Sequence, residues 1–173
     1  MKKKSIEDEI FEIVDENDNI IGKATRTECH GNPSLIHRTV HVVVFNSKGE
    51  ILLQKRSQKK DIQPGKWDTA VGGHLMPGED YETAAYRELA EELGVNYTGE
   101  FNFLFFSKIR NKIESENTKV FSILHDGPFS FNKEEIEEIR FWNNTELKAS
   151  IGKNIFTPNL ESELIKIFKL QKI

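Results

Sequence analysis

Three glutamates near the middle of the chain have the spacing of a carboxylate cluster. Glu88, Glu91 and Glu92 lie at positions i, i+3 and i+4, so on a helix their carboxylates would crowd into one stripe. Like charges at this spacing cost an isolated helix about 0.2–0.5 kcal/mol per pair, and a bound divalent cation would reverse that repulsion. Mg²⁺ prefers carboxylate and water oxygens and also holds substrate phosphates. The stripe therefore predicts a Mg²⁺ site, with Mn²⁺ as an alternative, or else an ordinary solvated helix face.

The helix that would carry these glutamates has both of its ends marked in the sequence. Asp80 is a good N-cap, and Gly94 is placed just past the C-terminal end. Between them, one face is apolar and lies beside the acidic stripe; its members are Tyr81, Ala85, Tyr86, Leu89 and Leu93. The sequence therefore predicts a short amphipathic helix that can pack on a sheet and present carboxylates at its edge.

The wider spacing resembles the Nudix box, over residues 73–95. Gly73 is followed after five residues by Glu79 and after seven more by the run R-E-L-A-E-E-L-G-V. The resemblance implies a Nudix hydrolase that cleaves a diphosphate linkage in a nucleoside-diphosphate-linked small molecule. It implies metal binding by Glu88, Glu91, Glu92 and the Gly73 carbonyl, and a pair between Arg87 and Glu79 that holds the loop against the helix. Which carboxylate acts as the general base stays open.

Flanking runs are similar to isopentenyl-diphosphate isomerase, a relative with the same fold. They are V-D-E-N-D-N-I-I-G-K-A from residue 14, C-H at 29–30, L-I-H-R at 35–38, F-N-S-K-G-E-I-L-L-Q-K-R from residue 45 and P-G-K-W from residue 64. The isomerase has a catalytic cysteine where this chain has Gly72, and its box is broken whereas this one is intact. Both departures favour hydrolysis. Isomerisation and a non-catalytic nucleotide-sensing module remain the alternatives, although such a module would be expected to lose catalytic glutamates.

The isomerase resemblance implies two further sets of residues. Its diphosphate-binding basic residues fall at Arg56 and Lys60 of this chain. Its metal site falls at His30, His37, His74, Glu114 and Glu116. Imidazole nitrogens suit Mn²⁺, Zn²⁺ or Fe²⁺ better than Mg²⁺, so a second metal could share the cleft. The alternative is that these histidines form hydrogen bonds inside the fold.

The elements that must position these residues follow from apolar alternation and turn chemistry. The expected strands are 11–15 and 20–25, 38–46 and 50–56, 67–71, 100–108 and 119–125, and 136–142. Residues 1–9 are expected to be a frayed start, and Gly72-Gly73 a turn into the box helix. Residues 109–118 are expected to be a polar loop and 160–170 a helix. A helical turn at 134–139 is the alternative to the strand at 136–142. Together they predict an α/β class fold, a Nudix-type α/β/α sandwich with a mixed β-sheet, as one domain over residues 1–173.

Composition limits the environment and the partners. The chain has 173 residues, a net charge of −4, one cysteine and no apolar stretch long enough to cross a membrane. We therefore expect a cytoplasmic protein in a reducing compartment that binds a small-molecule diphosphate rather than nucleic acid or a membrane. A homodimer is compatible with the resemblance. The substrate is not identified, because specificity depends on loops outside the box.

Overall fold

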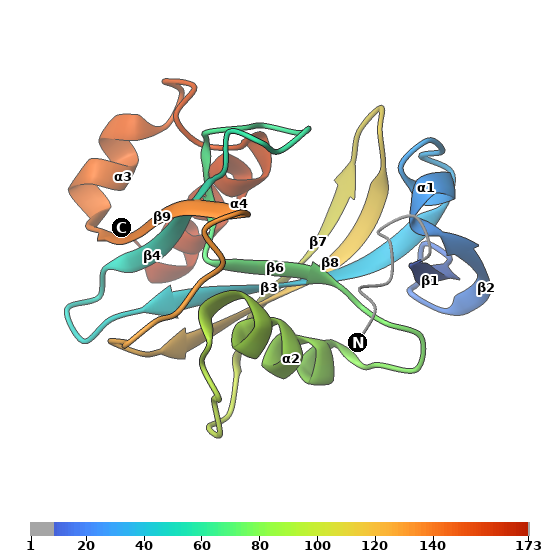
Figure 1. The fold of residues 1–173 in the computed structure, drawn as a ribbon, viewed down its shortest axis with the longest axis horizontal. Coiled ribbons are helices and arrows are strands. Elements are labelled where there is room, and N and C mark those ends of the chain that lie inside the picture. The colour runs from blue at the N-terminus through green and yellow to red at the C-terminus, as the bar shows by residue number, and fades with distance from the viewer. Residues whose placement is uncertain (1–8, 173) are drawn as a thin grey trace.

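The structure is a computed structural model that describes residues 9–172. Within this range nine strands form one mixed sheet, with helices on both of its faces, as the sequence predicts (Figure 1). The frayed start predicted for residues 1–9 falls almost wholly outside the described range. No helix of the described residues is long and apolar enough to cross a membrane.

The elements follow the predicted order. The strands are β1 (Ile10–Val14), β2 (Ile20–Thr25), β3 (Ile36–Phe45), β4 (Ile51–Arg56), β5 (Trp67–Thr69), β6 (Val71–His74), β7 (Asn102–Arg110), β8 (Ser115–Leu124) and β9 (Ile136–Trp142). The helices are α1 (Arg26–Cys29), α2 (Tyr81–Leu93), α3 (Asn144–Ser150) and α4 (Pro158–Gln171).

Strand β3 is the centre of the sheet. It pairs antiparallel with β1, β4 and β6, and parallel with β8 along its whole length, from Ile36 opposite Ser115 to Phe45 opposite Leu124. Because side chains alternate along a strand, β3 serves two layers. Val40, Val42 and Val44 pack in the core beneath α2, whereas His37, Thr39 and His41 lie on the face shared with Val43 and the α4 core.

The two main helices begin and end as their sequences predict. Asp80 accepts a hydrogen bond from the Thr83 N–H at the start of α2, and Gly94 adopts a left-handed φ of 65° just past its end. Thr157 caps α4 in the same way. Figure 1 shows α2 on one side of the sheet and α3 and α4 on the other, with α1 close to the β7–β8 turn.

Two local predictions are corrected by the structure, and two helices are added. Gly72 and Gly73 are not a turn but lie inside β6, where they pair with His41 and Val40 of β3. The predicted loop at 109–118 shrinks to a turn at 111–114, because polar side chains at the start of β8 bond across the sheet, as Thr118 does to Thr39 at 2.6 Å. Helices α1 and α3 were not predicted, although Asn143 and Glu146 form a capping box at the start of α3. The strand at 136–142 is confirmed over the helical-turn alternative.

Candidate active site and metal centre

The box helix brings two glutamates against the glycines of β6. Gly73 leaves the space that Glu88 fills, since a Cβ built on Gly73 would lie 2.1 Å from Glu88 Cδ. Glu92 Oε2 accepts hydrogen bonds from the Gly72 N–H at 3.3 Å and from Gln54 Nε2 at 3.2 Å. The Glu91 side chain is 57% exposed. The predicted stripe therefore has two inner carboxylates and one at its solvent edge.

The inner carboxylates are held in an environment that opposes their charge. Burial raises the pKa of Glu88 to about 7, although the adjacent Arg87 acts in the opposite direction. Burial and the neighbouring Glu88 raise the pKa of Glu92 to about 8. Burial is the main cause of both shifts, and a divalent cation beside these groups would favour the charged carboxylates that burial disfavours. The donor set, all hard oxygens, therefore fits Mg²⁺ or Mn²⁺.

Arg87 is the link between the box loop and the helix. Its guanidinium donates to both oxygens of Glu79, at 2.7 and 2.9 Å, and to the His74 carbonyl at 2.9 Å. It also donates to Glu88 Oε1 at 2.6 Å and to Glu91 Oε2 at 3.2 Å. The Arg87 side chain is only one-fifth exposed. A bidentate ion pair in such a position fixes geometry far better than an isolated surface pair does. The structure thus contains the pair expected from the resemblance.

The five residues of the second predicted set come together on the opposite sheet face. Ligand atoms of His30, His37, His74 and Glu114 lie within 4.8 Å of one another. Glu116 Oε1 approaches His37 Nε2 at 3.4 Å and His74 Nε2 at 3.6 Å. Strand register explains the meeting, because β3 pairs with β6 on one side and with β8 on the other.

The protonation of this histidine cluster suits a metal. Burial lowers the pKa of His74, and it lowers the pKa of His30 to about 4, so both imidazoles are neutral at neutral pH. Burial opposes ionisation of Glu116, but His37 and His74 hold its pKa well below the usual range. Buried imidazole nitrogens that make no hydrogen bond within residues 9–172 are His30 Nε2, His37 Nδ1, His37 Nε2 and His74 Nε2. Neutral imidazoles beside a carboxylate are the ligands that Mn²⁺, Fe²⁺ and Zn²⁺ prefer.

The two basic residues predicted to hold phosphate already have acidic neighbours. Arg56 donates to Asp68 Oδ2 at 3.3 Å and to the Ile62 carbonyl at 3.1 Å. Lys60 Nζ lies 3.6 Å from Glu135 Oε2. Neither residue contacts the box carboxylates through a hydrogen bond or ion pair in the described structure. Their role in binding substrate stays a prediction.

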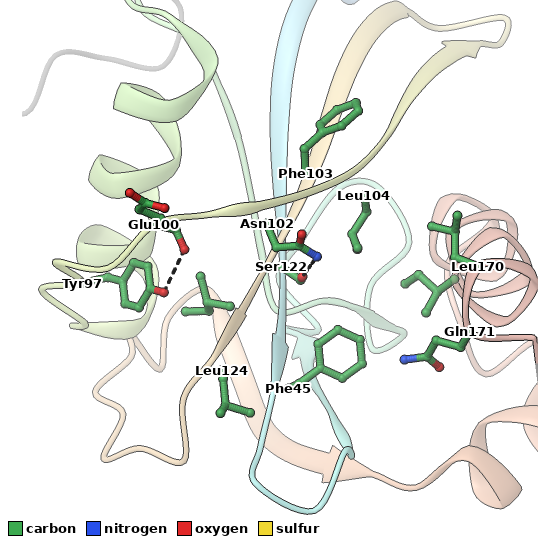
Figure 2. Close-up of a pocket in the computed structure, with 12 residues that line it drawn as sticks. Phe45, Tyr97, Glu100, Asn102, Phe103, Leu104, Ser122, Leu124, Leu170 and Gln171 are labelled. Atoms are coloured by element: carbon green, nitrogen blue, oxygen red, sulfur yellow. Dashed lines mark hydrogen bonds between the residues drawn. The ribbon is translucent and has the colours of Figure 1, made fainter.

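One mainly apolar cavity is remote from both clusters. It has a volume of about 650 Å³ and lies between the ends of β7 and β8 and the C-terminal part of α4 (Figure 2). Its walls are mainly apolar, with Phe45, Phe103 and Leu170 among them, and its described lining includes none of the residues predicted to carry chemistry. This cavity is therefore not the predicted active site. That site is recognised by its carboxylates and by their close approach to the backbone of the β6 glycines.

Sequence reasoning missed one buried polar pair. His41 Nδ1 lies 2.7 Å from Glu163 Oε2, joining β3 to α4. Alternation along β3 placed His41 on the same face as His37, which was a usable signal. Its partner is 122 residues away, and no local pattern identifies it.

Comparison with known proteins agrees with the box. The NUDIX domain family model matches residues 35–160. An uncharacterized Nudix hydrolase of Pseudomonas aeruginosa is 38% identical over 135 residues, 77% of this chain and 78% of that protein. Isopentenyl-diphosphate Delta-isomerase 2 of Photorhabdus laumondii is 35% identical over 148 residues, 84% of this chain and 83% of that protein.

A solved structure extends the likeness to the whole fold. A Deinococcus radiodurans protein superposes with a TM-score of 0.78 at 26% identity, covering 91% of this chain and 98% of that one. The family model spans well over half of the chain and includes the whole box. The intact box, the fold and these relatives together show that this chain belongs to the Nudix family.

Proposed function

We propose that this Nudix protein is a divalent-metal-dependent pyrophosphohydrolase that cleaves the diphosphate linkage of a nucleoside-diphosphate-linked small molecule. One observation carries the proposal. Glu88 is buried and Glu92 is partly buried, and both lie against the glycines of β6, with every fixed position of the box present. Burial raises the pKa of both carboxyl groups and so disfavours their charged form. Such a pair fits a site for a cation and a diphosphate better than it fits a solvated helix face.

Each residue has a defined task in this proposal. Glu88, Glu91, Glu92 and the Gly73 carbonyl would hold Mg²⁺, or Mn²⁺ in its place. Such an ion would neutralise non-bridging diphosphate oxygens and lower the pKa of an attacking water. Arg87 fixes the orientation of Glu88 and ties the loop to α2 through Glu79. Glu88 is either a third metal ligand or the carboxylate that takes the proton from water.

The chain lacks the catalytic cysteine that the isomerase alternative would need. Position 72 is glycine, and the chain has one cysteine, Cys29. Burial raises the pKa of that thiol to about 11, so it stays protonated in an apolar cluster with Phe11 and Ile13. These observations favour hydrolysis, even though several relatives carry the isomerase name.

The test is a substrate panel measured with Mg²⁺ and with Mn²⁺. It should contain dinucleotides, nucleoside diphosphate sugars and ADP-ribose, with isopentenyl diphosphate incubated in D₂O as the isomerase arm. We expect metal-dependent release of nucleoside monophosphate from at least one member and no deuterium in isopentenyl diphosphate. Binding without turnover across the panel would instead indicate the nucleotide-sensing module, and deuterium exchange would indicate the isomerase.

Mg²⁺ should raise the melting temperature, and more at about pH 9 than at about pH 6. The carboxyl pKa values of Glu88 and Glu92 rise from 4.5 to about 7 and about 8 in the fold. Their stabilising contribution is therefore complete below about pH 4.5 and is lost as pH rises through the folded pKa values. Mg²⁺ binds the deprotonated carboxylates. Its stabilisation of the fold should therefore be largest at alkaline pH, where the metal-free protein has lost most of this contribution. Calorimetry across this range measures the effect; a shift that does not change with pH would contradict it.

The histidine cluster should hold a transition metal. Protein purified without chelator should contain Mn²⁺, Fe²⁺ or Zn²⁺, and a His37→Ala/His74→Ala double mutant should lose it, because those imidazoles supply two of the ligands. Elemental analysis gives the result directly. Less than about a tenth of an equivalent in wild type, with an unchanged rate in the mutant, would leave only a hydrogen-bonding role.

A further inference from the structure

The sheet face covered by α4 contains a charged pair that the proposed reaction does not use. His41 of β3 and Glu163 of α4 are joined at 2.7 Å, and their side chains are only 13% and 7% exposed. Burial opposes the charge of the imidazole, but Glu163 raises the pKa of His41 to about 9. The His41 imidazole is therefore charged at neutral pH. A buried ion pair is weak evidence for stability, so its presence invites a functional reading.

Among the described residues, a hydrogen-bond partner is found for one oxygen of the Glu163 carboxylate and not for the other. Oε2 faces His41, whereas Oε1 is buried and makes no hydrogen bond within the described part of the chain. A buried acceptor without a donor costs free energy unless something supplies the missing bond. Glu163 also lines a cavity of about 200 Å³, together with Asn159, Ser162 and Lys166 of α4, Thr118 of β8 and residues 107–110 of β7.

Contacts connect the cavity to the strands that carry the histidine cluster and to the strand of the box glycines. Thr118 is bonded to Thr39 Oγ1, which in turn lies 3.4 Å from Glu116 of the histidine cluster. On the β6 side, His41 faces Gly72, where a built Cβ would lie 3.2 Å from His41 Cδ2 and 3.4 Å from Nε2. Gly72 is the residue before the metal-site glycine of the box. The cavity therefore lies on the sheet face of the histidine cluster, and His41, the partner of Glu163, links that face to β6.

The charges around Glu163 define the class of group that fits. An anion would meet the carboxylate, and a cation would meet the His41 imidazolium and the Lys166 ammonium, which donates to Ser107 Oγ at 2.7 Å. The other two cationic residues of the lining, Lys108 and Arg110, are already paired with Glu16. A neutral hydrogen-bond donor would be repelled neither by the carboxylate nor by the cationic groups. The cavity is also smaller than the 300–1,000 Å³ typical of sites for drug-sized ligands, which suits a fragment such as one sugar ring.

We propose that this cavity binds a sugar ring of the substrate, one of whose hydroxyl groups donates to Glu163 Oε1. The inference rests on the proposed function, because it takes the sugar to be attached to the diphosphate held by the box. His41 is then a positioning residue that fixes the carboxylate and keeps it charged. Glu163 selects diphosphates that carry a hydroxylated group over those that do not.

Binding of ADP-ribose and ADP, measured by calorimetry with Ca²⁺ in place of Mg²⁺, tests the proposal without turnover. The two probes differ by the terminal ribose. In Glu163→Gln the amide oxygen can still accept from His41, which leaves an NH₂ donor where Oε1 was. We expect ADP-ribose to bind wild type more tightly than ADP, and Glu163→Gln to weaken ADP-ribose about 10-fold or more while leaving ADP unchanged. Glu138→Gln, an exposed change on β9, is the matched control and should alter neither.

Equal affinities of ADP-ribose and ADP for wild type, or an equal change for both probes in Glu163→Gln, would overturn the proposal. Unchanged binding of both would show that the cavity holds only water. Asn159→Leu, an exposed substitution in the cavity lining, guards against misfolding of the buried variant and should also weaken ADP-ribose selectively. Because binding is read without catalysis, selective binding with no hydrolysis would contradict the pyrophosphohydrolase proposal and leave this one standing.

Discussion

Replacing Glu92 by glutamine should lower the rate of hydrolysis by about 10²–10³-fold or more while the fold survives. The partly buried carboxylate accepts a hydrogen bond from the Gly72 N–H and is one of two inner groups that would hold the cation. The amide keeps the size of the side chain and can still accept from the Gly72 N–H, but it offers no negative charge. Glu91→Gln should cause a comparable loss, because it removes the outer carboxylate of the same stripe.

Activity and stability should change in opposite directions in the Glu92 variant. Burial raises the pKa of Glu92 to about 8, so the neutral amide removes a charge that destabilises the metal-free fold at alkaline pH. The metal-free melting temperature at about pH 9 should therefore stay the same or rise. Glu82→Gln, on the exposed first turn of the same helix, is the control and should leave both rate and stability unchanged. Near-normal turnover in Glu92→Gln would remove the metal assignment.

Gly73→Ala should abolish most of the activity, whereas Gly72→Ala should retain much of it. A methyl group on Gly73 would lie 2.1 Å from Glu88 Cδ and 2.2 Å from Oε1, so the Glu88 carboxylate must leave its position. That carboxylate is also held by Arg87 at 2.6 Å, so the displacement disturbs the whole box loop. A methyl group on Gly72 would meet His41 Cδ2 at 3.2 Å, a contact that a shift of a few tenths of an ångström relieves.

The comparison separates loss of the site from loss of the fold. Both variants should stay folded by circular dichroism, with a lower melting temperature for Gly73→Ala, and the stabilisation by Mg²⁺ should disappear in that variant alone. The expected rate difference between the two is about 10²-fold, typical for displacement of a catalytic group. Equal activities would contradict the close packing of Glu88 against Gly73.

The sequence by itself determined those features whose parts are close along the chain. Asp80 and Gly94 mark the ends of α2 because capping is made within one turn. The positions of Glu88, Glu91 and Glu92 follow from the helical repeat, and the pair of Arg87 with Glu79 spans eight residues. The residues of the box are close together in the sequence, so their pattern predicts the family and the metal ligands without knowledge of the fold.

Tertiary structure decided on which face of the sheet the glycines and histidines of β3 and β6 lie. Gly72 and Gly73 were expected in a turn because glycine pairs usually break strands, but hydrogen bonding to His41 and Val40 keeps them in β6. The histidine cluster forms because β3 pairs with β6 and β8 in one register, and a shift of one residue would turn each side chain to the other face. His41 meets Glu163 only because α4 packs across that face. Strand register and helix packing depend on contacts between residues far apart in sequence, so these meetings are properties of the assembled fold and of no segment alone.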